Sequence, residues 1–183
     1  MSTGQTLSAV ALGLSLGACT PAATSGDAGA GTGTGAGEFV AFASDFDGYR
    51  TWAHASVVTD GGSGGAVHTD TVLVESINRG PVARDSDFPQ GTILVKEGTT
   101  GEPNTRQAFA MVKRGGDYNA GGAAGWEWFE LQNTGDGGEN TVEILWRGIA
   151  PPQGEVYAGK VNGDCNTCHV NAPHDGVYGP LGR

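Results

Sequence analysis

Short runs rich in β-branched and aromatic residues, with no helical stretch between them, constrain the fold of this chain more than any other feature. The five runs span residues 66–77, 91–97, 106–114, 125–132 and 141–148. Each run is bounded by Gly, Pro, Asn or Asp, the residues that favour turns. Parallel strands need long crossover connections, which are usually helical, and no such connection separates these runs. The pattern therefore predicts an antiparallel sheet of about five strands.

A helix is expected before this sheet, within residues 38–57 (EFVAFASDFDGYRTWAHASV). The apolar side chains that recur there at helical spacing are Phe39, Phe42, Ala43, Phe46, Tyr49 and Ala53. We predict one amphipathic helix, broken near Gly48. After the last strand, residues 162–175 predict a short helical turn followed by an irregular tail. A chain of 183 residues is expected to form one domain, and its fold class is α+β, mainly antiparallel sheet.

Near the C-terminus, Cys165 and Cys168 are two residues apart and His169 follows directly, giving CNTCH. In the C-x-x-C-H motif the two thiols bond to haem and the histidine supplies an axial ligand to its iron. A zinc site and a redox dithiol are the competing interpretations. A structural zinc needs about four ligands, whereas the one further cysteine is Cys19. A thioredoxin-like dithiol is expected beside a βαβ pattern, which this chain lacks. We therefore predict one haem c, with Cys165 and Cys168 as thioether anchors and His169 as the iron ligand.

The N-terminal part predicts export. Residues 1–18 have the length and apolar character of a signal peptide. They end in LGA before Cys19, which resembles the lipobox of bacterial lipoproteins, although Lys and Arg are absent from the preceding residues. Residues 19–37 are then a lipidated cysteine and a flexible tether rich in Gly, Ala and Thr, and 38–183 form the haem domain. The alternative is a plain secretory signal with Cys19 as a bystander.

Both interpretations of the N-terminus export the protein, and attachment of haem to C-x-x-C-H in bacteria also takes place outside the cytoplasm. We expect a periplasmic or outer-membrane-anchored lipoprotein whose contact with the membrane is the lipid on Cys19. The formal net charge of −10 disfavours nucleic acid or an anionic membrane surface as a partner. A neutral or cationic small substrate and a basic redox partner protein fit better, and the charge can also simply provide solubility.

Four motifs follow one another in the folded part: FPQGTILVKE (88–97), AMVKR (110–114), GWEW (125–128), and CNTCH with NAPHD behind it. In this order they resemble the cytochrome P-460 family, which includes the cytochrome c′-beta proteins. The resemblance covers about residues 38–183, and the order of the motifs is its specific part because C-x-x-C-H alone is generic. It implies a mostly antiparallel sheet with a flanking helix, one five-coordinate c-haem and a homodimer.

Two activities occur in that family, so the resemblance leaves the function open. P-460 cytochromes oxidise hydroxylamine, carry a lysine bonded to a meso carbon of the haem, and have a distal carboxylate that accepts protons. Cytochrome c′-beta proteins lack the lysine bond, have an apolar distal pocket, and bind NO or CO. We expect an oxidoreductase acting on hydroxylamine or a related small nitrogen species. The alternatives are a gas-binding protein without enzymatic activity and a simple electron carrier.

The resemblance assigns the bonded lysine among three candidates, Lys96, Lys113 and Lys160. Lys96 matches the VKE of the family's first strand and is our assignment, and Lys113 in MVKR is the second choice. Lys160 lies just before the haem motif and is better placed for a haem propionate. The alternative for Lys96 is an ordinary exposed lysine at the end of a strand, paired with Glu97. A bonding amine has to be neutral, and burial lowers the pKa of a lysine.

The distal carboxylate has two candidates, Glu127 and Glu130, which point to opposite faces of one predicted strand. Glu127 shares its face with Phe129, and Glu130 shares its face with Trp128. We assign the catalytic role to Glu127, because a glutamate among aromatic side chains has a raised pKa that suits proton transfer. The alternative is a half-exposed strand glutamate.

The sixth iron position decides between catalysis and simple electron transfer. The side chains that could fill it are His54, His68, His174 and Met111. An open position binds small molecules, with Phe88 and Phe109 as candidates to line it. A filled position makes the protein an electron carrier.

Overall fold

The computed structural model describes residues 37–58, 72–135, 141–157, 160–161 and 165–181. The chain divides into two units, 1–32 and 33–183, and all of these residues belong to the second. The predicted signal peptide (1–18), Cys19 and the tether up to residue 36 lie outside the described residues. Within the described ranges, no helix is long and apolar enough to cross a membrane.

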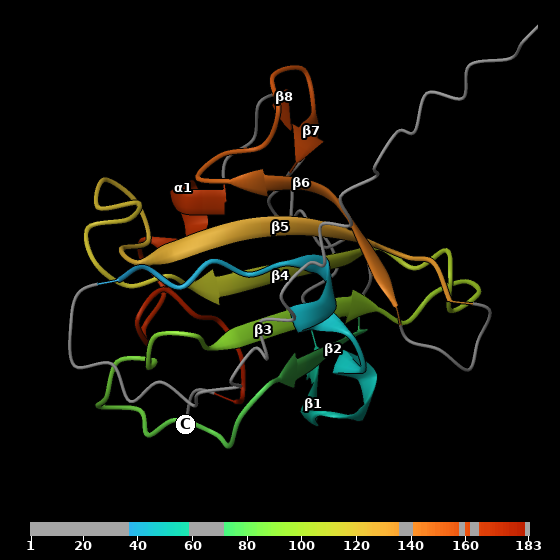
Figure 1. Ribbon diagram of the computed structural model, residues 1–183, viewed down its shortest axis with the longest axis horizontal. Coiled ribbons are helices and arrows are strands. Elements are labelled where there is room, and N and C mark those ends of the chain that lie inside the picture. The colour runs from blue at the N-terminus through green and yellow to red at the C-terminus, as the bar shows by residue number, and fades with distance from the viewer. Residues whose placement is uncertain (1–36, 59–71, 136–140, 158–159, 162–164, 182–183) are drawn as a thin grey trace, which may run out of the picture. The chain divides into compact units, whose positions relative to one another are not determined.

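One sheet of six antiparallel strands, in the order β1-β2-β3-β4-β5-β6, forms the body of the second unit (Figure 1). Its strands are β1 (Ala53–Val58), β2 (Val72–Ile77), β3 (Ile93–Gly98), β4 (Ala108–Lys113), β5 (Trp126–Asn133) and β6 (Val142–Gly148). Each neighbouring pair follows directly in sequence, so the strands form a meander. The antiparallel sheet is confirmed, with six strands instead of about five; each of the five predicted runs overlaps one strand, β2 to β6, and β1 is the additional strand.

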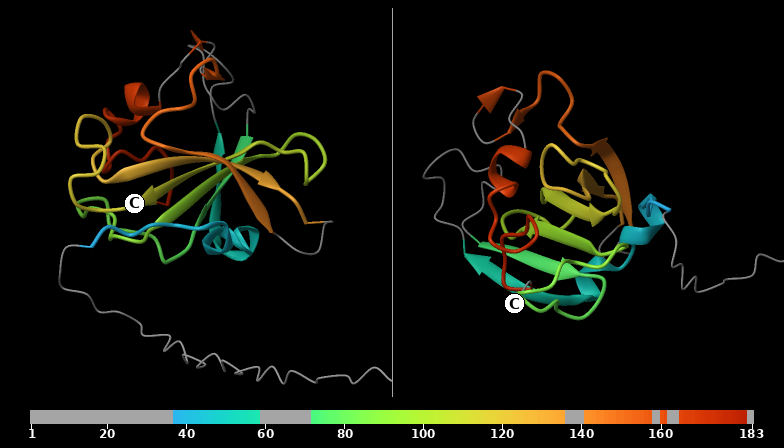
Figure 2. Two further views of the ribbon diagram at one scale, coloured as in Figure 1. Left: turned by 45° about the horizontal axis from the view of Figure 1, so that its top comes forward. Right: turned by 90° about the vertical axis from the view of Figure 1, so that its left-hand side faces the viewer.

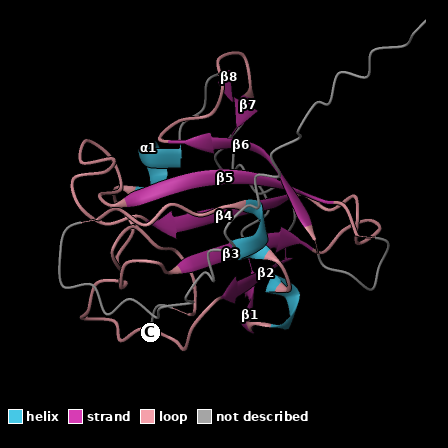
Figure 3. Ribbon diagram, viewed as in Figure 1, coloured by secondary structure: helices cyan, strands magenta, loops and turns pink. Residues whose placement is uncertain are grey.

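Two small elements follow the sheet. A two-stranded hairpin pairs β7 (Val156–Tyr157) with β8 (Lys160–Val161), and it was not predicted. A short helix, α1 (Cys165–His169), then carries the CNTCH motif (Figure 3). The helical turn expected around His169 is therefore present, and an irregular segment follows it up to Leu181.

The predicted helix over residues 38–57 is wrong. Two short 3₁₀ turns, η1 (Ala43–Phe46) and η2 (Tyr49–Thr51), stand in its place, and strand β1 comes directly after them. Phe42 is extended and 66% exposed, whereas its neighbour Ala41 is fully buried. This alternation has the period of two that belongs to extended chain. Gly48 then adopts a left-handed φ of 73°, which interrupts helical geometry.

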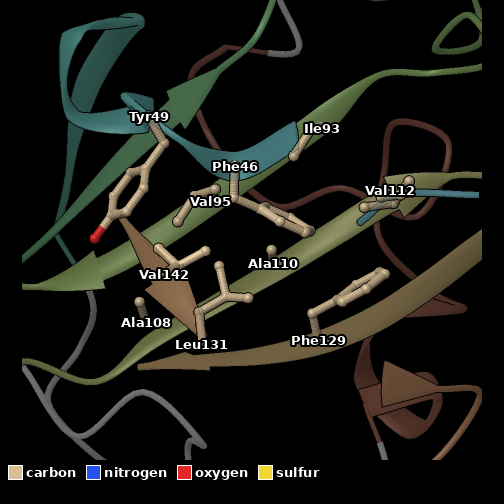
Figure 4. Packing of buried hydrophobic residues seen from close by; sticks show 11 residues of the cluster. Phe46, Tyr49, Ile93, Val95, Ala108, Ala110, Val112, Phe129, Leu131 and Val142 are labelled. Carbon is tan, nitrogen blue, oxygen red and sulfur yellow. The ribbon is translucent and has the colours of Figure 1, made fainter. Parts of the chain in front are cut away.

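The N-terminal segment and η1 cover one face of the sheet. The cluster buried there includes Phe46, Tyr49, Ile93, Val95, Ala108, Ala110, Val112, Phe129, Leu131 and Val142 (Figure 4). Full burial of a large apolar side chain contributes about 1.5–3 kcal/mol. Burial of Phe46 and Tyr49 therefore favours docking of this segment on the sheet without a helix. We call this side the N-terminal face.

The opposite face is covered by residues 165–181. Its apolar cluster consists of Ile77, Phe88, Leu94, Met111, Ala123, Trp126, Trp128, Trp146, Val177 and Leu181, with Cys165 packed against it. We call this side the α1 face. In the right-hand view of Figure 2 the C-terminal segment, in red, and the N-terminal turns, in cyan, lie on opposite sides of the sheet. Because both faces are covered, every residue of β3 is buried.

Candidate haem site

A row of polar and aromatic side chains crosses the α1 face of the sheet. Strand pairing aligns its members from β2 to β6: Glu75, Lys96, Phe109, Glu130 and Trp146. Paired residues on neighbouring strands point to the same face. The neighbouring row on this face holds Ile77, Leu94, Met111 and Trp128. Two glutamates and a lysine thus lie on the same side of the sheet as the CNTCH motif.

Asn166, between the two cysteines, anchors α1 to the sheet. Its Oδ1 accepts hydrogen bonds from Asn119 Nδ2 (2.8 Å), the Ala123 amide (3.1 Å) and Trp128 Nε1 (3.2 Å). Its Nδ2 donates to the carbonyl of Ile149 at 2.9 Å. A helix of five residues is not stable alone. These bonds therefore position the cysteines, and C-x-x-C-H spacing alone gave no signal of this role.

Close packing of Gly122 against Asn166 gives a first prediction, on haem attachment. A Cβ added at Gly122 would lie under 3.0 Å from the Asn166 side chain, whereas one added at Gly121 would meet nothing within 4 Å. We expect Gly122→Ala to displace α1 and to lower the yield of covalently bound haem severalfold. Gly121→Ala is the matched control and should load like the native chain. Haem staining of denaturing gels measures both, and equal loading of the two variants would contradict the anchoring role.

His169 is held as a neutral imidazole with a defined tautomer. Its Nδ1 lies 2.7 Å from the carbonyl oxygen of Gly176, and because a carbonyl only accepts, Nδ1 carries the proton. Burial and the nearby charge of Lys96 lower the pKa of His169 to about 4, although the Gly176 carbonyl opposes this. The ring packs against Trp128 at a centroid distance of 4.8 Å. Nε2 therefore keeps the lone pair that an iron ligand needs.

The residues of α1 fit a covalently attached haem. Cys165 and Cys168 lie on one helical turn as thiols that form no disulfide bond, the first half-buried against the apolar cluster and the second exposed. The next residue is the neutral imidazole of His169, and aromatic side chains line the sheet beneath it. Among the described residues, no three His, Cys, Asp or Glu side chains are grouped as a metal site would require. The segment offers two thiols for thioether attachment and one imidazole nitrogen for the iron, which is the set of groups that haem c requires.

Lys96 is buried on the α1 face and does not pair with Glu97. The residue is 7% exposed, its Nζ lies 3.7 Å from Glu75 Oε1, and it donates to the carbonyl of Tyr178. Glu97 points to the N-terminal face and binds Arg50 through two hydrogen bonds of 2.9 and 2.5 Å. The alternative of an exposed strand-end lysine is therefore wrong. Burial lowers the pKa of Lys96, and the charge of Glu75 opposes that shift.

Lys113, the second candidate, also lies on the α1 face but is bound elsewhere. Its Nζ is 2.7 Å from Asp175 Oδ1 and 3.0 Å from the carbonyl oxygen of Ala124. Asp175 Oδ2 in turn accepts the amide of Phe88 at 2.9 Å. Lys113 therefore fastens the segment after α1 to the sheet. The side chain of Lys160 lies outside the described residues.

The structure does not bring Glu127 together with His169 and Lys96, so the assignment of the catalytic carboxylate needs correction. Glu127 points to the N-terminal face, where Arg147 Nε and Nη2 donate to it at 2.8 and 2.7 Å. Arg147 also donates to the carbonyl of Ala41 at 2.6 Å, which ties the N-terminal segment to the sheet. Glu130, the alternative, lies on the α1 face and accepts Trp146 Nε1 at 2.8 Å. Side-chain alternation correctly predicted that the two glutamates point to opposite faces of the sheet. It did not predict which of the two faces α1 covers.

The candidates for the sixth iron position are spread over the fold. His54 lies in β1, where its Nδ1 is 2.9 Å from the Trp52 carbonyl oxygen, and His68 lies outside the described residues. His174 is buried, with Nε2 at 2.6 Å from the carbonyl oxygen of Ser86. Met111 lies on the α1 face next to Trp128.

The two phenylalanines proposed to line the iron site differ in their contacts. Phe109 lies on the α1 face, between Lys96 and Glu130 in the row across the sheet. Phe88 packs against the rings of Trp126 and His174, at centroid distances of 5.5 and 4.7 Å. Phe109 therefore keeps its candidate position, whereas Phe88 belongs to the packing of the C-terminal segment.

Two residues of the α1 face were missed by the sequence analysis. Glu75 is fully buried although its side chain is polar, and its carboxyl group lies beside the amine of Lys96. The sequence does contain a signal for Glu75: it shares one strand face with Leu73 and Ile77, and it is the polar residue on an otherwise apolar face. Tyr178 contacts both His169 and Lys96. Its position after α1, in a segment predicted as irregular, gave no comparable signal.

Comparison of the chain with protein-family models, with curated proteins and with solved structures found no match. The resemblance to the cytochrome P-460 family therefore rests on the quoted motifs alone.

Proposed function

We propose that this chain is an exported c-type haem protein that oxidises hydroxylamine or a related small nitrogen compound. The observation that carries the proposal is the position of Lys96: its buried amine lies on the sheet face that the CNTCH segment covers. Cys165 and Cys168 would hold the haem, and His169 would ligate its iron through Nε2. When bound, the haem supplies an iron that can bind the nitrogen compound and take up its electrons.

The side chains of the row across the α1 face would provide the bond to the porphyrin and the proton acceptor. Lys96 would bond through its amine to a meso carbon of the porphyrin; one N–H and the meso C–H bond would break, with two protons released and two electrons passed to an external oxidant such as a peroxide. Glu75 beside it would hold that amine in place. Oxidation of hydroxylamine releases protons as well as electrons, so a carboxylate within reach of the substrate is needed. Glu130 takes this role instead of Glu127, because it shares the α1 face with Lys96. The two residues are two strands apart, about 10 Å, and Phe109 stands between them.

The formal net charge of −10 favours a basic protein as the acceptor of the electrons. Export would follow from the N-terminal residues, with Cys19 as the lipid anchor. A second candidate function is binding of NO or CO without turnover. The apolar side chains of Phe109 and Met111 on the α1 face favour it, because gas binding needs no proton acceptor.

Replacement of Lys96 tests the proposal most directly. The native ferrous protein should have a main haem band displaced from that of an ordinary c-haem, and it should oxidise hydroxylamine with an artificial electron acceptor. Lys96→Met should restore the ordinary spectrum, because the porphyrin then has no amine to bond. Lys113→Met tests the second candidate on the same face. It removes the ion pair with Asp175 and should still keep the displaced haem band, because the proposal bonds the porphyrin to Lys96 and not to Lys113.

The remaining outcomes separate the candidates. A native protein with an ordinary c-haem spectrum, no turnover and tight NO or CO binding favours the gas-binding function. A native protein without covalent haem rules out both functions. A spectrum that changes with Lys113→Met and not with Lys96→Met retains the P-460 type of function and transfers the bonded lysine to the other strand.

A further inference from the structure

The segment Gly176–Leu181, which follows α1, contacts both the iron ligand and the buried lysine pair. At one end, the carbonyl of Gly176 accepts Nδ1 of His169 at 2.7 Å. At the other end, the amide of Leu181 donates to Glu75 Oε2 at 3.2 Å. Only four residues separate these two bonds along the chain. We refer to Gly176–Leu181 as the strap.

Tyr178, in the middle of the strap, touches both groups by itself. Its ring meets the imidazole of His169 edge to face, at a centroid distance of 5.5 Å and an interplanar angle of 71°. Its hydroxyl donates to the carbonyl of Cys168 at 3.2 Å. Its backbone carbonyl accepts the amine of Lys96. One residue therefore contacts the turn that carries His169 and also the amine proposed to bond to the porphyrin.

The strap has little freedom to move at its lysine end. A Cβ added at Gly179 would lie under 3.0 Å from both carboxylate oxygens of Glu75, so the strap backbone rests directly on this carboxylate. Glu75 is fully buried and Lys96 is 7% exposed, so neither can swing into solvent without opening the core. A change at Lys96 therefore acts directly on Glu75 and on the strap, because Lys96 contacts both and the strap also contacts Glu75.

We propose that the strap couples Lys96 to the iron ligand and that Tyr178 is the positioning residue that transmits the coupling. The inference rests on the proposed function, in which His169 ligates haem iron. Hydrogen bonding to the second nitrogen of an imidazole ligand sets its basicity and orientation, and through these the reduction potential of the metal. Loss of the hydrogen bond from the Lys96 amine frees the carbonyl of Tyr178. The strap then shifts at Gly176 and Tyr178, the two residues that contact His169.

A double-mutant cycle on the haem-loaded protein tests the coupling, with the reduction potential as the readout. The variants are Tyr178→Ala, Lys96→Met and the combination of both. Coupled residues give shifts that do not add, whereas independent residues give shifts that do. We expect each single variant to shift the potential, and we expect Tyr178→Ala to have a clearly smaller effect once Lys96 is replaced. Val170→Ala, at an exposed apolar side chain directly after His169, is the control and should leave the potential unchanged.

Two further variants keep the test decisive if Tyr178→Ala does not load haem. Tyr178→Phe removes only the hydroxyl bond to Cys168, and Gly179→Ala pushes the strap against Glu75 and leaves the Tyr178 side chain in place. Either should shift the potential in native protein and shift it less in the Lys96→Met background. Additive shifts, or a potential that none of these variants moves, would overturn the coupling while the protein still holds haem. A native protein that carries no haem would instead contradict the proposed function.

Discussion

Replacing Cys165 and Cys168 with alanine together should abolish covalent haem completely. In this chain these two cysteines are the one pair at C-x-x-C-H spacing, and both are thiols on α1 that form no disulfide bond. A thioether bond to haem needs a thiol, so alanine at both positions leaves no atom for attachment. The expected result is total loss of the haem band after denaturing electrophoresis, with the polypeptide still present.

The fold should survive this double substitution, which makes the result interpretable. Cys168 is exposed and Cys165 is half-buried, so truncation of either leaves at most a small cavity. Cys165 packs at the edge of the α1 face, away from the strands at the centre of the sheet. Thr167→Ala, at the exposed position between the two thiols, is the matched control and should keep its haem. A haem band that persists in the double variant would refute the attachment site and the proposed function with it.

The strands of the sheet could be predicted because the residues that favour turns mark where each strand begins and ends. β3 and β5 are runs of β-branched and aromatic residues closed by turn residues, and local preference and tertiary structure agree there. Residues 38–57 failed for the opposite reason. Their apolar residues fit a helical spacing and also an extended one, and the decision came from the sheet face on which Ala41 and Phe46 are buried. Tertiary packing of this kind does not appear in a local pattern.

The residues of the candidate site also fall into two groups, those defined by a local motif and those that depend on tertiary packing. The local motif is enough to define three of them, Cys165, Cys168 and His169, because they lie within five consecutive positions. The assignments of Lys96 and Glu127 depend on which face of the sheet the C-terminal segment covers, and this is set by contacts such as the one between Trp128 and Asn166, which are 38 positions apart. Alternation places two residues on the same or on opposite faces, but it leaves the identity of each face open. Lys96 therefore falls on the face that α1 covers, and Glu127 on the other.

Glu127 and Glu130 should respond in opposite ways to the same substitution. They lie three residues apart in β5, and glutamine preserves the shape of each while removing its charge. We expect Glu127→Gln to lower stability and Glu130→Gln to lower turnover. The comparison is well controlled, because strand, residue type and chemical change are all shared.

The loss of stability in Glu127→Gln follows from the two arginines around this carboxylate. Glu127 is 2% exposed, with Arg147 at 2.7 Å and Arg114 at 3.4 Å. Removal of one partner from a buried ion pair costs about 3 kcal/mol, at the low end of the known range because Arg147 is partly exposed. Chemical denaturation should therefore show a lower unfolding midpoint. Hydroxylamine turnover per haem should stay close to native, because this side chain faces away from α1.

Glu130→Gln should have the opposite profile, because its carboxylate lies on the α1 face and is the proposed proton acceptor. In the native protein Glu130 accepts a hydrogen bond of 2.8 Å from Trp146 Nε1. Glutamine can still accept this bond, so the unfolding midpoint should change little. It cannot take up a proton, and loss of a general base slows a reaction about 10²–10⁴-fold. Binding of NO or CO should persist, since it needs no base. Slower turnover in Glu127→Gln at an unchanged midpoint would reinstate Glu127 as the base, and unchanged turnover in both variants would show that neither glutamate accepts the proton.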